Sequence, residues 1–117
     1  RWRAARTFGP CAGRALAGLL RQCHVAVTAS RFEPGAMHPV ESLQCGLPLL
    51  YHADGGGTVE LGSKFGVLLR EDIPSAVEEM KQSYSALRSR LLREGPSGDG
   101  MCLQYRQLTQ SLLAQRS

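Results

Sequence analysis

Apolar side chains recur with helix or strand spacing in successive segments of the chain. Residues 12–23 place Leu16, Leu19, Leu20 and Cys23 on one face of a predicted helix. HVAVTAS at 24–30 is rich in β-branched residues and ends at small polar ones, which predicts a strand. A helix follows in which Pro39 suits the first turn because its φ is already helical, and Gly46 ends it.

The second half of the chain continues this alternation. Residues 47–52, LPLLYH, form an uninterrupted apolar run, as expected for a strand covered on both faces. The glycine-rich segment 53–61 predicts a turn leading into a brief helix, and FGVLL at 65–69 predicts a third strand. A long helix is expected from about Pro74, with Ser75 and Glu78 at capping-box spacing. Its expected apolar face consists of Ile73, Val77, Met80, Tyr84, Leu87 and Leu91.

A last helix is expected after the breaker cluster EGPSGDG at 94–100. Its apolar positions keep the helical period at Met101, Tyr105, Leu108 and Leu112. Helices alternating with strands predict an α/β fold, Rossmann-like and three-layered, with a short parallel sheet. Sheets of this type usually have more than three strands. We therefore expect residues 1–117 to be one partial domain, truncated at its N-terminus.

Length and charge narrow the possible functions. The 117 residues suffice for one domain, and no apolar run approaches the roughly 18–20 residues of a membrane span, so we expect no transmembrane segment. The net charge of +4 comes mainly from arginine, since the chain has twelve Arg and only two Lys. That balance is compatible with an anionic ligand, but it fits a GC-rich genome equally well. Only three arginines cluster near the N-terminus, with no RNA-binding motif around them, so we expect no nucleic-acid partner.

The cysteines and histidines show no pattern of a metal site. The four cysteines, Cys11, Cys23, Cys45 and Cys102, are widely spaced and form no CxxC pair. The three histidines, His24, His38 and His52, lack the spacing of metal ligands. We expect no bound metal, and we expect reduced, mostly buried thiols in a cytosolic protein.

The segment SRFEPGAMHP carries the main candidate chemistry. It follows the strand at 24–30, and open parallel sheets bind ligands beyond the carboxyl ends of their strands. Gly35 and Ala36 allow close approach to the backbone, and the amides before the next helix favour an anion such as diphosphate. The carboxylates of Glu33 and Glu41 can accept hydrogen bonds from adjacent hydroxyls. These features together predict a sugar–diphosphate–nucleoside ligand.

The same residues also have plain structural explanations. In a first helical turn Glu41 stabilises the helix dipole by about 0.3–1 kcal/mol without any ligand. Glu33 would then be an exposed loop acid, and Glu60 a helix acid. The glycines at 55–57 would form an ordinary turn rather than a phosphate cradle, and His38 would be a solvated residue at the helix start. The residues alone leave both explanations open.

The stretch from 30 to 60 resembles the signature of retaining nucleotide-sugar glycosyltransferases of the two-Rossmann-domain, GT-B fold (glycosyltransferase group 1, family 4-like). That signature reads S-R-x-E-[GP]-F-G-L-x-x-x-E-A-M-A-x-G-x-P-V, followed by G-G-x-x-E. The matching positions are Ser30, Glu33, Pro34, Glu41, Gly46, Pro48, Gly56, Gly57 and Glu60. The chain departs from it at Gly35-Ala36, in place of F-G, and at 42–44, in place of A-M-A. We interpret these departures as an altered donor geometry.

The resemblance implies roles for individual residues but assigns no catalytic residue. Donor-sugar contacts are implied for Glu33, Gly35, Ala36, Met37 and His38. Diphosphate contacts are implied for the amides of Gly35, Ala36 and Met37, ribose contacts for Glu41, and a secondary loop at Gly56, Gly57 and Glu60. No cofactor or metal is implied; the nucleotide sugar is the substrate.

The resemblance also implies what the whole enzyme does. It would transfer the glycosyl group to an acceptor glycan, lipid or other hydroxyl compound that is bound by a preceding domain. That domain does not fit in the 117 residues, so we expect the fragment alone to be inactive. Its expected location is the cytoplasm, either free or peripheral to the membrane. The alternative is a non-catalytic Rossmann-like binding module with a vestigial donor site.

Overall fold

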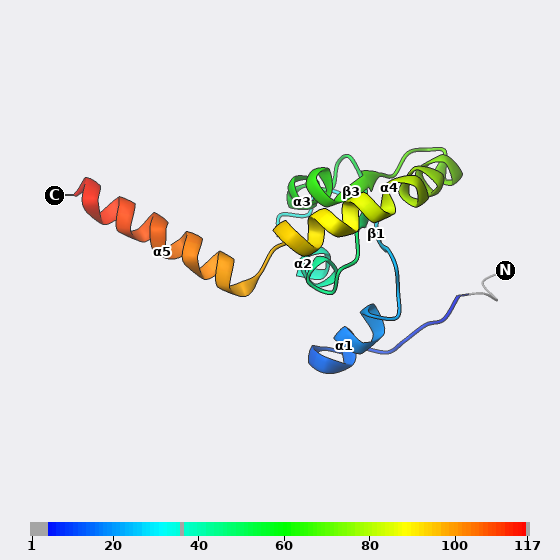
Figure 1. The fold of residues 1–117 in the computed structure, drawn as a ribbon, viewed down its shortest axis with the longest axis horizontal. Coiled ribbons are helices and arrows are strands. Elements are labelled where there is room, and N and C mark those ends of the chain that lie inside the picture. The colour runs from blue at the N-terminus through cyan, green and yellow to red at the C-terminus, as the bar shows by residue number, and fades with distance from the viewer. Residues whose placement is uncertain (1–4, 36, 117) are drawn as a thin grey trace.

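The computed structural model describes residues 5–35 and 37–116, and it has an α/β fold (Figure 1). The eight predicted elements occur in the predicted order. The described residues contain the helices α1 (Gly13–Leu20), α2 (Met37–Gln44), α3 (Gly57–Phe65), α4 (Ile73–Glu94) and α5 (Gly98–Gln115). The strands are β1 (Ala26–Thr28), β2 (Leu49–Tyr51) and β3 (Gly66–Leu68).

The three strands form one parallel sheet in the order β1-β2-β3. In the central strand Leu49 pairs with Ala26 of β1 and with Gly66 of β3. Every residue of β2 is buried, which confirms the prediction from its apolar run. Burial also raises the pKa of the Tyr51 phenol above its usual value. This small open sheet is compatible with a fragment of a Rossmann-like fold.

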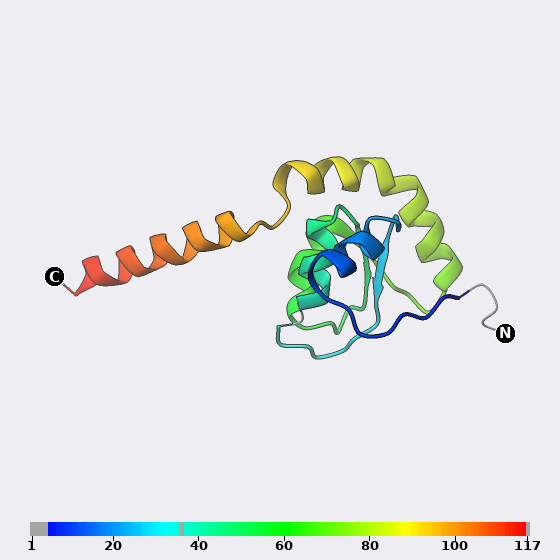
Figure 2. The same ribbon diagram turned by 90° about the horizontal axis from the view of Figure 1, so that it is seen from below.

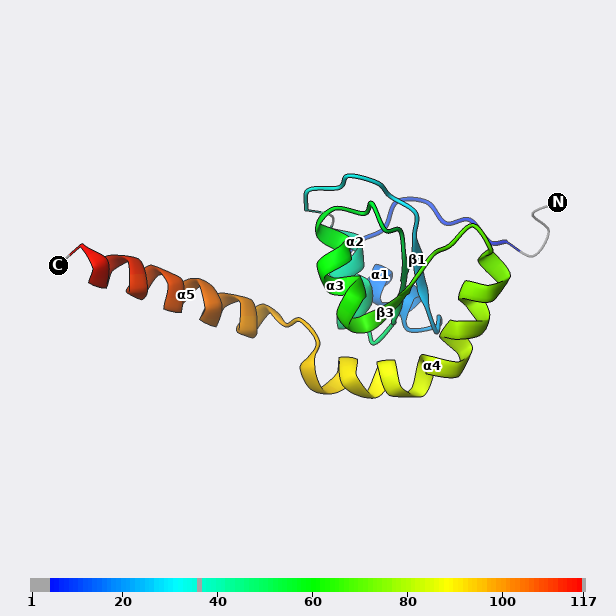
Figure 3. The same ribbon diagram turned by 90° about the horizontal axis from the view of Figure 1, so that it is seen from above.

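Helices cover both faces of the sheet, as Figure 3 shows, with α2 and α3 on one side and α4 curving around the other. The core on the α2 and α3 side contains Leu43, Leu49, Phe65 and Leu91. The core on the α4 side contains Leu50, Val67, Ala76 and Met80. The successive β2 residues Leu49 and Leu50 thus pack into the cores on opposite faces of the sheet, because side chains alternate across a strand. Since α4 bends around the sheet (Figure 2), its end also joins the first core through Leu91.

The start of α4 differs from the prediction. The N-cap is Asp72, whose carboxylate accepts a hydrogen bond from the Ser75 amide at 3.2 Å and one from the Ser75 hydroxyl at 2.6 Å. These hydrogen bonds lower the pKa of Asp72 below its usual value. The predicted capping box of Ser75 and Glu78 is therefore wrong. Pro74 lies in the first helical turn, so the helix begins earlier and Ser75 is a donor within it.

Apolar residues on β1 and at the start of α4 that were expected in the core are exposed beside the free edge of β1. Val27 is 64% exposed, and at the start of α4 Ile73 and Val77 are 49% and 37% exposed. Beside β1 lies a largely apolar hollow of about 400 Å³, which includes Val25, Val27, Val77, Met80 and Tyr84 among its lining residues. The predicted apolar face of α4 is thus fully buried only at Met80 and Leu91.

Helix α5 projects away from the rest of the molecule (Figure 1), and none of its residues is buried. The radius of gyration is 16.5 Å, whereas a compact chain of this length has roughly 13 Å. The apolar stripe predicted for this helix, Met101, Tyr105, Leu108 and Leu112, is 53–65% exposed. Over the described part of the chain, no helix is both long and apolar enough to cross a membrane.

The cysteines are free thiols, but the expectation that they are mostly buried is wrong. Cys11, Cys23 and Cys102 are exposed, and Cys45 is half-buried. The exposed three lie on or beside α1 and on α5, the helices in which no residue is buried.

Candidate functional site

The two candidate loops pack against each other at the carboxyl ends of β1 and β2. The Phe32 amide donates to the Asp54 carbonyl at 2.6 Å, and the Gly57 amide donates to the Glu33 carbonyl at 2.9 Å. An exposed ion pair between Arg31 and Asp54, 3.1 Å apart, lies beside these bonds. The loop after β1 and the glycine loop after β2 therefore form one unit, at the edge where open parallel sheets bind ligands.

Gly56 is required for this contact. Its backbone has φ 68° and ψ −129°, a combination that L-residues with a side chain rarely adopt. A Cβ atom at this position would lie 2.8 Å from the nitrogen and 3.0 Å from the carbonyl carbon of Glu33. Gly56 and Gly57, which the resemblance places in a secondary loop, thus hold the Glu33 loop in position. Their contacts in this structure are those of a supporting turn.

The first part of the predicted site is open to a ligand. A Cβ atom added at Gly35 would meet no atom within 4 Å, so the backbone there can be approached closely. Met37 is the first residue of α2, and its side chain is 64% exposed. Glu33 is half-buried. Ala36, which the resemblance assigns to the sugar and diphosphate, lies outside the described residues.

His38 is tied to the end of β1. Its Nε2 atom lies 3.0 Å from the hydroxyl of Thr28, the buried last residue of that strand. This hydrogen bond holds the ring at the start of α2. His38 is therefore more than a solvated residue at a helix start, although the sugar contact implied by the resemblance is not shown.

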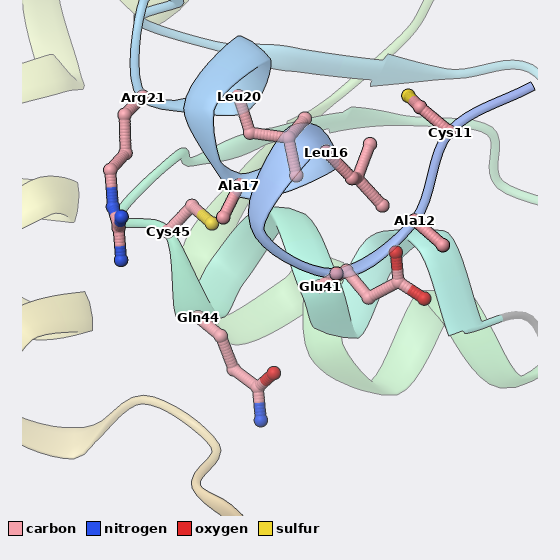
Figure 4. A pocket seen from close by; sticks show the side chains of 10 residues that line it. Cys11, Ala12, Leu16, Ala17, Leu20, Arg21, Glu41, Gln44 and Cys45 are labelled. Carbon is pink, nitrogen blue, oxygen red and sulfur yellow. The ribbon is translucent and has the colours of Figure 1, made fainter.

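Glu41 lies in a hollow that the sequence did not reveal. The hollow lies between α1 and α2 and has a volume of about 390 Å³ (Figure 4); ligand sites usually measure about 300–1,000 Å³. Its lining residues come from both helices and from the segment before α1. They are Cys11, Ala12, Gly13, Leu16, Ala17, Leu20, Arg21, Glu41, Gln44 and Cys45.

The two helices contribute different chemistry to this hollow. The side chains of Leu16, Ala17 and Leu20 form an apolar wall from α1, and Arg21 follows directly after that helix. Helix α2 contributes Glu41 and Gln44, and Cys45 comes directly after it. Each set has the i, i+3 or i+4 spacing of one helix face. The sequence could therefore have indicated the two faces, but not that they stand opposite each other with space between them.

The two glutamates have different surroundings in the described part of the chain. Glu41 lines the space between α1 and α2, and Glu33 is not among the residues that line it. Glu33 instead belongs to the loop held by Gly57. A ligand that contacts both carboxylates would have to extend from the hollow past the N-terminus of α2. Glu60 is exposed in the first turn of α3, where an acid stabilises the helix dipole.

Thr58 is a residue that sequence reasoning missed. It lies in the first turn of α3 and is 3% exposed, and its hydroxyl has no hydrogen-bond partner among the described residues. Its Cβ atom is 3.4 Å from the place where a Cβ on Gly55 would lie, so it packs beneath the glycine loop. A buried unpaired hydroxyl at a candidate ligand loop is unusual enough to test.

The structure shows no metal site in the described parts of the chain, since no three His, Cys, Asp or Glu side chains gather there. Comparison with models of known protein families, with curated proteins and with solved structures finds no match for this chain. A function for the protein therefore rests on its residues and their geometry.

Proposed function

We propose that this chain is the donor-binding part of a GT-B glycosyltransferase, and that it binds a nucleotide-activated sugar. The observation that carries the proposal is the position of Glu41. This carboxylate borders a ligand-sized hollow one helical turn beyond the N-terminus of α2. The sequence signature at 30–60 supports the same assignment.

The order of groups along α2 fits the order of groups in a nucleotide. The first amides of the helix point toward its N-terminus, where the helix dipole favours the diphosphate. Glu41 follows Met37 by about 6 Å along the axis, at a rise of about 1.5 Å per residue. Its carboxylate can accept hydrogen bonds from both ribose hydroxyls, since each carboxylate oxygen is an acceptor. Phosphate and ribose would thus follow each other along one helix.

The loop at Glu33 would hold the sugar on the other side of the diphosphate. Its carbonyl is fixed by the Gly57 amide, and the neighbouring Gly35 leaves space for a ligand to approach the backbone. In the transfer reaction the negative charge on the departing diphosphate would be stabilised by the amides and the positive end of α2. The acceptor hydroxyl would come from a substrate bound by another domain, so the chain alone would bind the donor without transferring the sugar. We place the enzyme in the cytoplasm.

Calorimetric titration of the chain with UDP, GDP and ADP and their sugar conjugates tests this proposal. Hydrogen bonds to a charged group contribute about 1.5–3 kcal/mol. Glu41→Ala should therefore weaken the binding of the preferred nucleotide about tenfold or more. The 2′,3′-dideoxy nucleotide should bind the wild-type chain equally weakly and should lose little further affinity in the variant. Glu78→Ala, which removes an exposed acid on α4, is the matched control.

The alternative function is a non-catalytic binding module with a vestigial donor site. Glu33 is not among the residues that line the hollow at Glu41, and this position favours the alternative. Failure of every nucleotide and nucleotide sugar to bind the folded chain would support this alternative. Binding that Glu41→Ala leaves unchanged would contradict the assigned role of Glu41.

A further inference from the structure

Helix α1 is held weakly against the rest of the molecule. None of its residues is buried, and its apolar residues Leu16, Ala17, Leu19 and Leu20 remain half-exposed. The preceding residues 5–12 are irregular and exposed, and a short turn at 21–25 connects the helix to β1. In Figure 1, α1 lies below α2 and outside the layers that enclose the sheet. The hollow at Glu41 separates its apolar face from α2.

The chemistry of the hollow fits a nucleobase. A base is a flat ring with two apolar faces and a polar edge. The wall formed by Leu16, Ala17 and Leu20 can cover one face of such a ring, while Glu41 lies beside it for the attached ribose. A base in this space would also hold the two helices together, since it would make van der Waals contacts with the apolar face of α1, which is not buried.

We propose that α1 is a lid that closes over the base of the bound nucleotide. This inference rests on the proposed function, because the ligand is the same nucleotide. The turn at 21–25 would act as the hinge, and closure would bury the apolar face of α1 against the base. Closure and binding are thermodynamically linked, so a change that favours the closed lid raises the affinity for the nucleotide by the same factor.

The cysteines of the chain report on closure directly. Cys11 and Cys45 line the hollow, whereas Cys102 is exposed on α5, far from it. We would measure the alkylation rate of each thiol with iodoacetamide by peptide mass spectrometry, with and without saturating UDP, GDP or ADP. A closed lid should slow the alkylation of Cys45 and Cys11 roughly tenfold and leave that of Cys102 unchanged.

A substitution on α1 separates lid closure from general stabilisation. Ala17→Phe places a ring in the hollow, so it should lower the nucleotide affinity about tenfold or more and shield Cys45 even without nucleotide. Ala15→Phe adds the same ring to an exposed position of the same helix and should change neither quantity. Circular dichroism would show that both variants are folded.

The outcomes distinguish this inference from the proposed function. If calorimetry detects nucleotide binding but the alkylation rates of Cys11 and Cys45 stay the same, the lid is wrong and the donor site stands. Equal nucleotide affinities of Ala17→Phe and Ala15→Phe would also overturn the lid. If no nucleotide binds, the proposed function fails and the lid fails with it.

Discussion

Substitution of Gly56 by alanine tests whether the glycine loop holds the Glu33 loop in position. The added methyl group would meet two different obstacles. The backbone at Gly56 has φ 68° and ψ −129°, and the new Cβ would lie 2.8 Å from the Glu33 nitrogen. Neither obstacle can be relieved by a side-chain rotation, because the opposing atoms belong to the backbone. The two loops would have to separate, which would also break the bond from the Gly57 amide to the Glu33 carbonyl.

The cost of Gly56→Ala can be estimated from these two effects. A sparsely populated backbone conformation costs about 1–3 kcal/mol, and overpacking costs about 1–3 kcal/mol more. The smaller conformational freedom of alanine in the unfolded chain offsets about 0.4–1 kcal/mol. We therefore expect a loss of about 3 kcal/mol. For a domain of this size the midpoint of thermal unfolding should fall by roughly 12–24 °C, at about 4–8 °C per kcal/mol.

Thermal and urea unfolding, followed by circular dichroism, would measure this loss. Gly35→Ala is the matched control, because a Cβ there meets nothing within 4 Å and the residue belongs to the same pair of loops. Its unfolding free energy should stay within about 0.5 kcal/mol of the wild-type value. Equal stabilities of Gly56→Ala and Gly35→Ala would refute the conclusion that the two loops are locked together at Gly56.

Three further substitutions test a hydrogen bond at the end of α2, the buried hydroxyl of Thr58 and the N-cap of α4. Arg88 donates to the Gly46 carbonyl at 2.7 Å in a partly buried contact, so Arg88→Ala should lower the free energy of unfolding in urea by about 1–3 kcal/mol. Arg90→Ala, which removes an exposed contact, is the control and should lower it by less than about 0.5 kcal/mol. Thr58→Val replaces a buried hydroxyl that has no hydrogen-bond partner among the described residues. It should leave stability unchanged or raise it by up to about 1 kcal/mol, and a clear loss would reveal a partner for the hydroxyl. The hydrogen bonds from Ser75 lower the pKa of Asp72 below its ordinary value of 3.8, so its ionised form stabilises the folded state at neutral pH. This contribution is lost in acid, as the pH falls below the ordinary value and through the lower folded-state pKa. Wild-type and Asp72→Asn melting temperatures should therefore converge in acid, and a difference independent of pH would contradict this.

Local sequence patterns were sufficient for the order of elements and for the central strand. Leu49, Leu50 and Tyr51 are apolar in succession, and the structure buries all three. The pattern could not indicate the exposure of Val27, because that depends on whether another segment covers the free edge of β1. The start of α4 near Pro74 was predictable, but its cap was not, because Asp72 and Ser75 are both common helix-capping residues and only the geometry distinguishes them.

The candidate site was predictable in part. The position of the Glu33 loop after β1 follows from the alternation of strands and helices, and its closeness to the glycine loop follows from parallel pairing. The hollow at Glu41 did not follow, since the distance between α1 and α2 depends on side chains from two separate segments. The separation of Glu33 from this hollow was likewise invisible in the spacing of the two glutamates.

Backbone amide mapping tests the central claim most directly, namely that the N-terminus of α2 and Glu41 bind a nucleotide diphosphate. A ¹⁵N-labelled chain would be titrated with UDP, GDP and ADP while its amide resonances are recorded by NMR. We expect the largest shifts of at least one of the three to cluster at Gly35, Met37, His38 and Glu41, with those of α5 unchanged. Saturating nucleotide that leaves these amides unshifted, or that shifts only residues elsewhere, would contradict the account.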